Sequence, residues 1–449
     1  MSSTIALISS AVFDTILYPL NLVSNGTESV SSIYETIYSM QLVILRQNIA
    51  YISICLYLLW YIKAYLSKTD IIAKEGSLMH KMLDKFTAVH TGYRPTIWCF
   101  PAALNTIVFA FIQRCIKQEY EREILKADDG GLIAIDWVNL NAPKKVILIV
   151  FPGLTGCSRD NYVTHLVDKA VKEGCSAVVM NYRGIEVELT TPRTYCATDT
   201  SDLHMVVNHV HNKFKEHKIF AVGVSLGGIK LGGYLAKQYE DSLINFAMIV
   251  SAPMNTIYSC EELEKTHNFF MFNRHLSRSL SRYFSKYQHL FEADKRYDCA
   301  AIARCSSLRE FDIRFVCKQF GYASCLDYYK DACLDAKIQN IKVPTIFLNA
   351  GDDMFSPARA FPVEKIKQNP YTAMVWTKYG GHISFCEGIM PTGCNYVCRL
   401  LKEYLHYVLN ESNEIEKLIE LERCNLKISS SLSDLSEETD EKELKFTLE

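Results

Sequence analysis

Short apolar runs alternate with longer amphipathic stretches through the middle of the chain. From residue 146 to residue 250, runs of Val, Ile, Leu and Phe too short for helices are separated by segments with apolar residues at helical spacing. The pattern predicts four strands, at 146–151, 177–181, 219–224 and 246–250, and three helices, at 161–172, 199–214 and 229–239. Strands that are apolar on both faces and alternate with helices indicate an α/β fold, with a mostly parallel sheet covered by helices on both faces.

A hairpin precedes this alternation and a helical insertion follows it. Two strands at 123–126 and 132–138 are joined by Asp128-Asp129-Gly130-Gly131, which is a strong hairpin signal. Residues 254–340 have helical spacing and many charges without a clear strand, so we expect an insertion that covers the end of the sheet as a lid. The sheet then resumes, with two strands and a last helix expected at 344–348, 373–377 and 396–409.

The first part of the chain carries the signal of a membrane span. Residues 1–45 contain no Lys or Arg, whereas a secretory signal begins with positive charge, so we expect no cleavage there. Residues 49–66 are almost wholly apolar and aromatic, and the only break, Lys63, lies near one end, where it can reach the interface. We therefore predict one transmembrane helix over 46–68. The alternative is a long helix buried in a protein core.

The last part of the chain has a different composition. Residues 411–449 are acidic, rich in Ser and poor in aromatic residues. Such a segment cannot bury enough apolar surface to fold alone, so we expect a disordered tail, or helix as far as residue 421. One large domain is thus expected over residues 77–410.

Charge and cysteine usage narrow the possible functions. The formal net charge is −2, which provides no broad basic field, so we expect no nucleic-acid partner. The 16 cysteines are scattered singly, without C-x-x-C pairs or metal-ligand spacing. This pattern suits a reducing compartment and predicts neither a metal site nor a cofactor.

The sequence Gly223-Val224-Ser225-Leu226-Gly227 stands between a predicted strand and a predicted helix. In a G-x-S-x-G elbow the serine lies at the tip of a strained turn, and the flanking backbone is so close that Gly223 and Gly227 have a steric reason to lack side chains. We interpret Ser225 as a nucleophile. The alternative is a glycine-rich turn without chemistry.

A serine nucleophile needs a base and an acid, and both follow in the order that an α/β-hydrolase fold requires. The strand ending at residue 348 leads into Gly351-Asp352-Asp353-Met354-Phe355-Ser356-Pro357, and the strand ending at 377 leads into Gly380-Gly381-His382. We predict His382 as the base. Asp353 is favoured over Asp352 as the acid, because an apolar residue follows it and Pro stands four positions on.

Acyl transfer also needs donors for the oxyanion of the tetrahedral intermediate. The backbone N–H of Leu226, at the start of the helix after Ser225, is one candidate. The second is the N–H of Leu154 in Pro152-Gly153-Leu154-Thr155-Gly156, the loop after strand 146–151. Taken alone, that loop could equally be a simple turn.

Several segments of residues 77–410 resemble one family, the membrane-anchored α/β-hydrolase-domain lipid esterases of the AB hydrolase superfamily (AB hydrolase 4 family), and most closely its phospholipase-like subgroup. They are Pro95-Thr96-Ile97-Trp98-Cys99, Asp128 to Gly130 with Asp136-Trp137, Pro152-Gly153-Leu154-Thr155-Gly156, Asn181-Tyr182-Arg183-Gly184, Thr191-Pro192-Arg193-Thr194-Tyr195-Cys196, Gly223-Val224-Ser225, Arg309-Glu310-Phe311-Asp312, Asp353-Met354-Phe355-Ser356-Pro357 and Gly380-Gly381-His382.

The resemblance implies an N-terminal membrane anchor, a triad of Ser225, Asp353 and His382, and esterase activity on lipid acyl esters such as phospholipids or acylglycerols. An acyltransferase or ester synthase, which passes the acyl group to an alcohol, would use the same residues. Against that alternative, Glu387 stands where the H-x4-D motif of some acyltransferase-like relatives has Asp. A non-enzymatic lipid-binding protein on the same fold is a third reading.

Two arguments about location disagree. The family is commonly described as type II, which would place the domain in the lumen, and we expect a single-pass protein of the endoplasmic reticulum. Arg46, at the first position of the predicted span, is the only basic residue on its N-terminal side, whereas several lysines lie at or beyond its C-terminal end, and positively charged flanks stay in the cytosol. These lysines are Lys63, Lys68, Lys74, Lys81 and Lys85. We therefore predict a cytosolic catalytic domain.

The insertion contains an apolar cluster of Phe269, Phe270, Met271, Phe272 and Phe291. This cluster is either the surface on which an acyl chain lies or ordinary packing, and the sequence leaves the two readings open.

Overall fold

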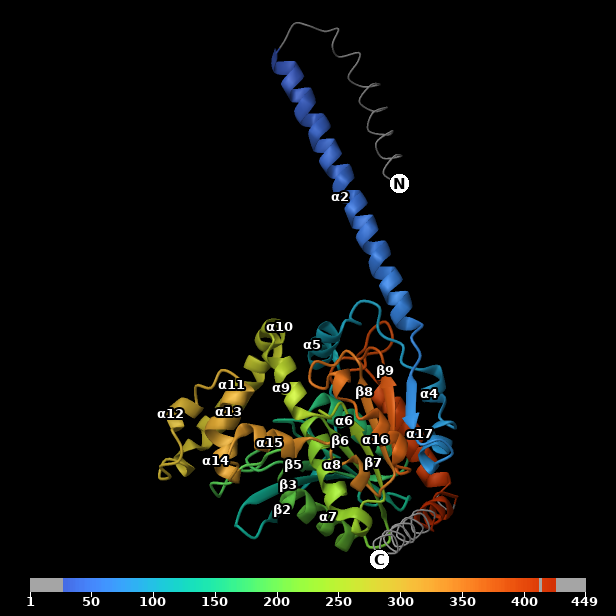
Figure 1. Cartoon of the computed structure of the whole chain (residues 1–449), viewed down its shortest axis with the longest axis vertical. Coiled ribbons are helices and arrows are strands. Elements are labelled where there is room, and N and C mark those ends of the chain that lie inside the picture. Colours follow the sequence, from blue (N-terminus) through green and yellow to red (C-terminus); the bar gives the residue numbers. More distant parts are fainter. Residues whose placement is uncertain (1–26, 412–413, 425–449) are drawn as a thin grey trace, which may run out of the picture. The chain divides into compact units, whose positions relative to one another are not determined.

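The structure is a computed structural model that describes residues 27–411 and 414–424. The chain forms two compact units that divide between Lys63 and Ala64. The first unit consists of most of helix α2 (Thr27–Tyr65), and the second contains the sheet and all the later elements (Figure 1).

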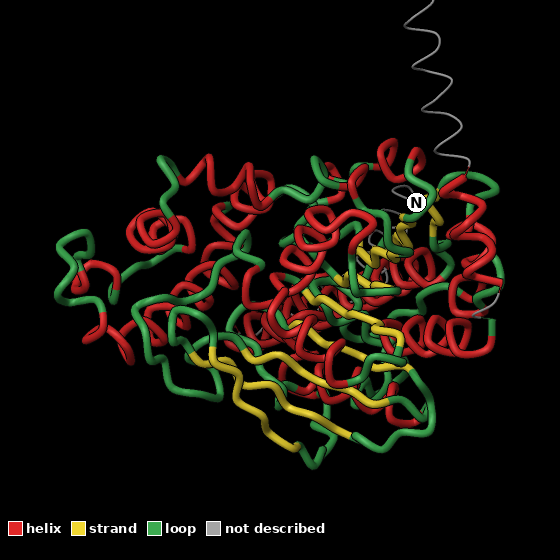
Figure 2. The backbone as a smooth tube through the Cα atoms, turned by 90° about the horizontal axis from the view of Figure 1, so that it is seen from below, coloured by secondary structure: helices red, strands yellow, loops and turns green. Residues whose placement is uncertain are grey.

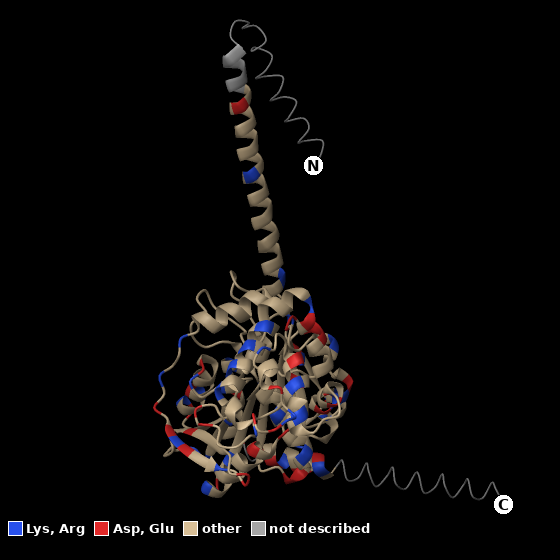
Figure 3. Ribbon diagram, turned by 90° about the vertical axis from the view of Figure 1, so that its left-hand side faces the viewer, with Lys and Arg blue, Asp and Glu red and all other residues tan. Residues whose placement is uncertain are grey.

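Helix α2 begins earlier and ends earlier than the predicted span at 46–68. Residues 27–45 contain no Gly or Pro, so no strong helix breaker separates Thr27 from the predicted span. The stretch Tyr34–Tyr65 is long and apolar enough to cross a membrane, and none of its most apolar part is buried. In Figure 3 the helix is tan apart from a few charged positions. The rest of the expected N-terminal segment, residues 1–26, lies outside the described residues.

Within the described residues, nine strands form one sheet in the order β1-β9-β8-β7-β6-β4-β5-β3-β2. The six strands that lie between β9 and β5 in this order, both included, are parallel to their neighbours in that set. Strand β1 pairs antiparallel with β9, β3 with β5, and β2 with β3. The bounds are β1 (Asp70–Ala73), β2 (Glu121–Lys126), β3 (Leu132–Val138), β4 (Val146–Phe151), β5 (Ser176–Asn181), β6 (Lys218–Val224), β7 (Phe246–Val250), β8 (Thr345–Ala350) and β9 (Thr372–Thr377). The predicted strands and the hairpin are confirmed.

Strand β1 was not predicted. It consists of only four residues, Asp-Ile-Ile-Ala, too few to show a period, and it is placed by pairing with β9 through Ile71 and Val375 at the edge of the sheet. Tertiary pairing, which a local pattern does not show, makes it a strand.

Helices cover both faces of the sheet (Figure 2). Because successive strand residues face opposite sides, Leu148 and Val150 of β4 lie in one core cluster and Ile147 and Ile149 in the other. The first face is covered by α3 (Leu78–Leu83), α4 (Thr87–Thr91), α6 (Asn161–Lys172) and α17 (Tyr396–Asn410). The second face is covered by α7 (Ser201–Lys213), α8 (Leu226–Gln238) and α16 (Val363–Gln368).

The segment between β7 and β8 is helical, as expected. Its longer pieces are α9 (Thr256–Glu264), α11 (Arg274–Tyr287) and α15 (Cys325–Ala332), with the short elements α10 (Thr266–Asn268), η3 (Phe269–Asn273), α12 (Cys299–Ile302), α13 (Leu308–Phe311), η5 (Asp312–Val316) and α14 (Cys317–Phe320). Its own core is aromatic, with the rings of Phe284 and Phe315 4.9 Å apart at their centroids. This insertion therefore packs as a separate cluster against the sheet domain.

The start of the acidic tail packs on the domain. Residues 414–424 are helical, and Ile415 is buried in the same core cluster as α17. This matches the helical reading of the first part of the tail, and residues 425–449 lie outside the described part of the chain.

Candidate active site

Ser225 lies in a strained turn between β6 and α8. Its φ of 54° and ψ of −115° put a non-glycine residue in a region that L side chains rarely adopt. A Cβ on Gly223 would lie 2.6 Å from the carbonyl oxygen of Gly227, and a Cβ on Gly227 would lie 2.0 Å from that of Phe151. The steric need for both glycines is confirmed, and α8 begins at Leu226, three residues before the predicted start.

The structure brings Ser225, His382 and Asp353 into one chain of hydrogen bonds. The Oγ of Ser225 is 2.9 Å from Nε2 of His382. On the other side of the imidazole, Nδ1 is 2.9 and 3.1 Å from the two carboxylate oxygens of Asp353. The Asp353 side chain is fully buried and His382 is 8% exposed. Three residues from the ends of β6, β8 and β9 meet here because these strands are parallel and end at one edge.

Two further residues hold the imidazole. The backbone N–H of His382 donates to Oγ1 of Thr106 in helix α5 (Ala102–Ile112) at 2.9 Å. The ring of Phe355 stacks on the imidazole, with the two ring centroids 4.1 Å apart. The backbone N–H of Phe355 donates to the Asp353 carboxylate at 2.7 Å. Sequence reasoning missed both roles. Phe355 lies inside the acid loop, but Thr106 is 276 residues from His382 and gives no sequence signal.

Asp352 faces the glycine turn and not the imidazole. One of its oxygens accepts the N–H of Gly381 at 3.0 Å, and the other is buried without a partner among the described residues. Burial raises the pKa of Asp352 to about 7, and the neighbouring Asp353 charge adds to this effect. The choice of Asp353 as the partner of His382 thus agrees with the geometry.

The loop after β4 lies directly against Ser225. A Cβ on Gly153 would be 3.5 Å from the Cβ of Ser225. The N–H of Gly153 donates to the hydroxyl of Tyr162 at 2.8 Å, and that of Thr155 to the hydroxyl of Tyr195 at 3.2 Å. By contrast, the N–H groups of the two predicted oxyanion donors, Leu154 and Leu226, have no hydrogen-bond partner within the described residues.

An apolar cavity of about 150 Å³ opens beside these two donors. Leu154, Leu226 and Ile229 line it on the side of the sheet domain, and the insertion provides the opposite wall, which includes Leu263, Leu280, Leu308, Asp312, Tyr328 and Tyr329. The predicted aromatic cluster of the insertion does not line this cavity. Phe291 is buried in the aromatic core of the insertion, and Phe270 is 63% exposed.

Asp312 is a buried acid in the cavity wall. The hydroxyl of Tyr329 donates to its Oδ2 at 2.9 Å. Burial raises the pKa of Asp312 to about 8, so the carboxyl group is mostly protonated at neutral pH. Its motif, Arg309-Glu310-Phe311-Asp312, is part of the family resemblance, but nothing in that motif indicates a cavity.

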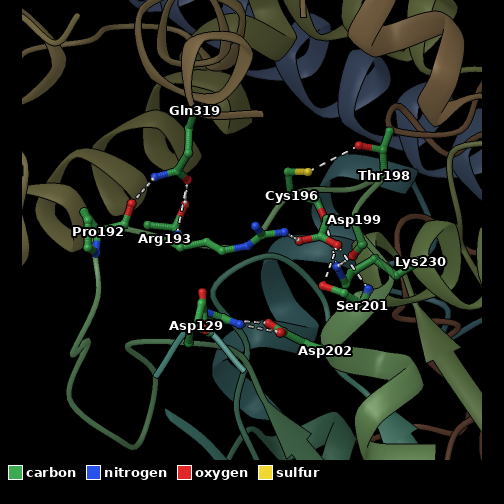
Figure 4. Close-up of polar contacts among 12 residues, drawn as sticks. Asp129, Pro192, Arg193, Cys196, Thr198, Asp199, Ser201, Asp202, Lys230 and Gln319 are labelled. Atoms are coloured by element: carbon green, nitrogen blue, oxygen red, sulfur yellow. Dashed lines mark hydrogen bonds and ion pairs between the residues drawn. The ribbon is translucent and has the colours of Figure 1, made fainter. Parts of the chain in front are cut away.

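A charged network anchors the loop of residues 183–200, part of which borders the site (Figure 4). Arg183 makes two hydrogen bonds to Asp202, at 2.7 and 2.8 Å, and one to Asp129 of the hairpin at 2.6 Å. The ammonium of Lys230, buried in α8, donates to the carbonyl oxygens of Cys196 and Asp199. The loop is thereby fixed to the helix that begins at the elbow.

No cluster of three or more His, Cys, Asp or Glu side chains that could hold a metal ion occurs among the described residues. The described cysteines are all free thiols and form no disulfide bond with one another.

Known proteins resemble this chain over most of its length. No family model matches it. It is 35% identical over 370 residues to a mouse protein named phospholipase ABHD3, covering 81% of this chain and 90% of that one. It is 31% identical over 250 residues to the yeast monoacylglycerol lipase, covering 54% and 55% of the two chains. A solved esterase of Pyrococcus furiosus, Pf2001, aligns with a TM-score of 0.45 at 15% identity, over 65% of this chain and 92% of that one. The 35% identity to the mouse protein over 90% of its length shows that the chain belongs to the AB hydrolase family of esterases and lipases, in the subgroup of phospholipase ABHD3.

Proposed function

We propose that this protein is a membrane-anchored serine hydrolase that cleaves acyl esters of lipids, phospholipids foremost, through Ser225, His382 and Asp353. The observation that carries the proposal is the continuous chain of short contacts from the Ser225 hydroxyl to the buried Asp353 carboxylate. The serine end of this chain of contacts lies beside an apolar cavity and beside the backbone N–H groups of Leu154 and Leu226, which have no partner among the described residues.

In the first half of the reaction, Oγ of Ser225 attacks the ester carbonyl carbon, and Nε2 of His382 takes the hydroxyl proton. The carboxylate of Asp353 holds Nδ1–H toward itself and stabilises the imidazolium. The oxyanion lies between the N–H groups of Leu154 and Leu226, and one such donor lowers the barrier by about 3 kcal/mol. The positive end of α8 adds to this stabilisation.

The intermediate then collapses. The bond from the carbonyl carbon to the alcohol oxygen breaks, and the imidazolium of His382 gives its proton to the departing lysolipid or glycerol oxygen. A water molecule, deprotonated by the same Nε2, attacks the acyl-enzyme. A second collapse releases the fatty acid and returns the proton to Ser225, so no cofactor is consumed.

The cavity supports a substrate with an alkyl chain. Half of its lining residues, including Leu154 and Leu226, are Leu, Ile or Ala, whose side chains bury an acyl chain favourably. The family adds a second argument, because relatives are named phospholipase and monoacylglycerol lipase.

We further propose that helix α2 anchors the enzyme in the endoplasmic reticulum membrane by a single pass, with the catalytic domain in the cytosol. The apolar stretch Tyr34–Tyr65 supports the anchor. Lys63 and the lysines after it support the cytosolic side, because Arg46 is the only Lys or Arg among residues 1–62.

Fluorophosphonate labelling of the full-length protein tests the proposed function. Ser225→Ala should remove both the label and the hydrolysis of a panel of phospholipids and acylglycerols, whereas Ser279→Ala, a half-buried serine of α11, should change neither. Label that persists on Ser225→Ala would refute the assignment. An alcohol added to the same assay measures acyl transfer, and an ester product formed faster than free fatty acid would favour the acyltransferase reading.

A further inference from the structure

Three segments close to the site lack charged residues altogether. They are residues 95–113, 266–273 and 388–398, and none of them contains Asp, Glu, Lys or Arg, although 22% of the chain is charged. The first segment includes helix α5, the second includes η3 of the insertion, and the third follows the loop of His382. Their lack of charge is unusual for segments with so much exposed surface.

Hydrogen bonds and apolar contacts join the three segments into one region. The indole N–H of Trp98 donates to the carbonyl oxygen of Ile389 at 2.7 Å, and the N–H of Arg114 donates to that of Thr392 at 3.1 Å. Ile107 of α5 packs in one apolar cluster with residues of the insertion. In Figure 1, α5 and α10 are both drawn at the upper end of the hydrolase unit.

Large apolar side chains project from this region into solvent. Phe111 is 85% exposed and Ile389 is 81% exposed. We call the full set the apolar rim: Ile97, Trp98, Leu104, Phe111, Phe270, Met271, Ile389 and Met390. Single exposed apolar residues are ordinary, but a contiguous group of this size marks a surface that meets another apolar phase.

Exposed basic residues stand at the ends of the uncharged segments. Arg94 and Arg114 bracket the first segment, and Arg274 follows the second. An apolar centre with cations at its margin matches a membrane leaflet, whose acyl region is apolar and whose headgroups include anionic lipids.

The end of the candidate membrane span lies at the same margin. Tyr65, the last residue of α2, belongs to the hydrolase unit, and its hydroxyl accepts a hydrogen bond from Nη1 of Arg94 at 2.9 Å. The Arg94 guanidinium also lies over the Tyr65 ring, 5.3 Å from its centroid. Arg94 stands three residues before Ile97 of the rim, so the residue that ends the candidate span contacts the segment that carries the rim.

Two segments that carry rim residues adjoin the loop of the catalytic histidine. Helix α5 exposes Leu104 and Phe111 while its Thr106 accepts the N–H of His382. Seven residues after His382, the same loop exposes Ile389. We propose that the apolar rim docks into the phospholipid leaflet and delivers lipid to Ser225 directly from the bilayer. This inference deepens the proposed function and rests on it, since the surface serves a lipid substrate.

Quenching of Trp98 by brominated lipid tests the docking directly. The full-length protein is placed in nanodiscs of phosphatidylcholine and phosphatidylserine, with or without phosphatidylcholine brominated in its acyl chain. Trp60→Phe removes the tryptophan of α2, and the difference between Trp60→Phe and Trp60→Phe/Trp98→Phe isolates Trp98. Bromolipid should lower the Trp98 signal on the order of twofold, as for an interfacial indole.

A Trp98 that bromolipid does not quench would overturn the proposal. If that Trp98 is also shielded from iodide in solution, protein and not lipid covers the rim. Ser225→Ala should leave the quenching unchanged. Failure of the proposed function, which Ser225→Ala tests by activity, is thus distinguishable from failure of the docking.

Charge inserted into the rim provides a second readout. Phe111→Glu/Ile389→Glu should lower hydrolysis of nanodisc phospholipid on the order of tenfold, because two buried apolar groups are lost from the leaflet. Hydrolysis of a soluble short-chain ester should not change. The control is Ile124→Glu, an exposed position on β2 away from the rim, which should leave both activities intact. Equal loss of both activities in the rim variant would overturn the interfacial role.

Discussion

The Asp353→Asn substitution tests how the imidazole is oriented, because it removes the charge facing Nδ1 of His382 and keeps the size of the side chain. Both Asp353 oxygens lie within 3.1 Å of that nitrogen. An amide there can donate to Nδ1, which leaves the proton on Nε2, where the ring cannot accept the proton of Ser225. In a serine triad this change lowers kcat on the order of 10⁴-fold, or about 5.5 kcal/mol.

Asp352→Asn is the matched control in the neighbouring position. Its carboxyl group accepts the N–H of Gly381 at 3.0 Å, and an amide oxygen can accept the same hydrogen bond. With a pKa of about 7, Asp352 is already about half protonated at pH 7, so the neutral amide resembles a form that the native enzyme populates. We expect kcat to fall by less than about tenfold, which corresponds to about 1.4 kcal/mol.

The assay is kcat of the full-length variants on a soluble ester at pH 6 and pH 8, normalised to the folded fraction by thermal unfolding. The Asp352→Asn effect should be smaller at pH 6, where native Asp352 is mostly protonated. The reasoning is refuted if Asp352→Asn costs as much as Asp353→Asn.

Three further predictions concern stability and topology. Gly227→Ala should destabilise the fold by about 3 kcal/mol or more, because its Cβ would lie 2.0 Å from a backbone oxygen. In the same helix, a Cβ at Gly233 would have no atom within 4 Å, so Gly233→Ala should stabilise the protein by about 1 kcal/mol. Thermal unfolding of the two variants measures both effects. Between about pH 4 and pH 8 the Asp312 carboxyl group ionises in the unfolded chain but stays protonated in the folded protein. As the pH rises through this range, the free energy of unfolding of the native protein should therefore fall relative to that of Asp312→Asn. A difference in Tm between the two proteins that does not change with pH would contradict this prediction. Endoglycosidase treatment should detect a glycan on Asn25 and none on Asn410, and a glycan on Asn410 would place the domain in the lumen.

Local features of the sequence determined the sheet and the identity of the elbow. Strands β4 to β9 are apolar on both faces, and a run such as Val146–Phe151 is buried whatever its neighbours are, so periodicity alone predicts it. Gly223 and Gly227 are required by the backbone geometry of the turn itself. Because parallel strands end at one edge, the order of Ser225, Asp353 and His382 along the chain also predicted that they would meet.

Tertiary structure alone decided the features that depend on contact between distant segments. Strand β1 exists through its pairing with β9, and Thr106 reaches the catalytic loop only because α5 packs there. One wall of the cavity, which includes Asp312, comes from the insertion. Some of the aromatic residues of the insertion pack on one another instead of lining the cavity. No spacing along the chain encodes these contacts. They arise because apolar surfaces must find partners in three dimensions, and the sequence pattern shows that a face is apolar without showing what covers it.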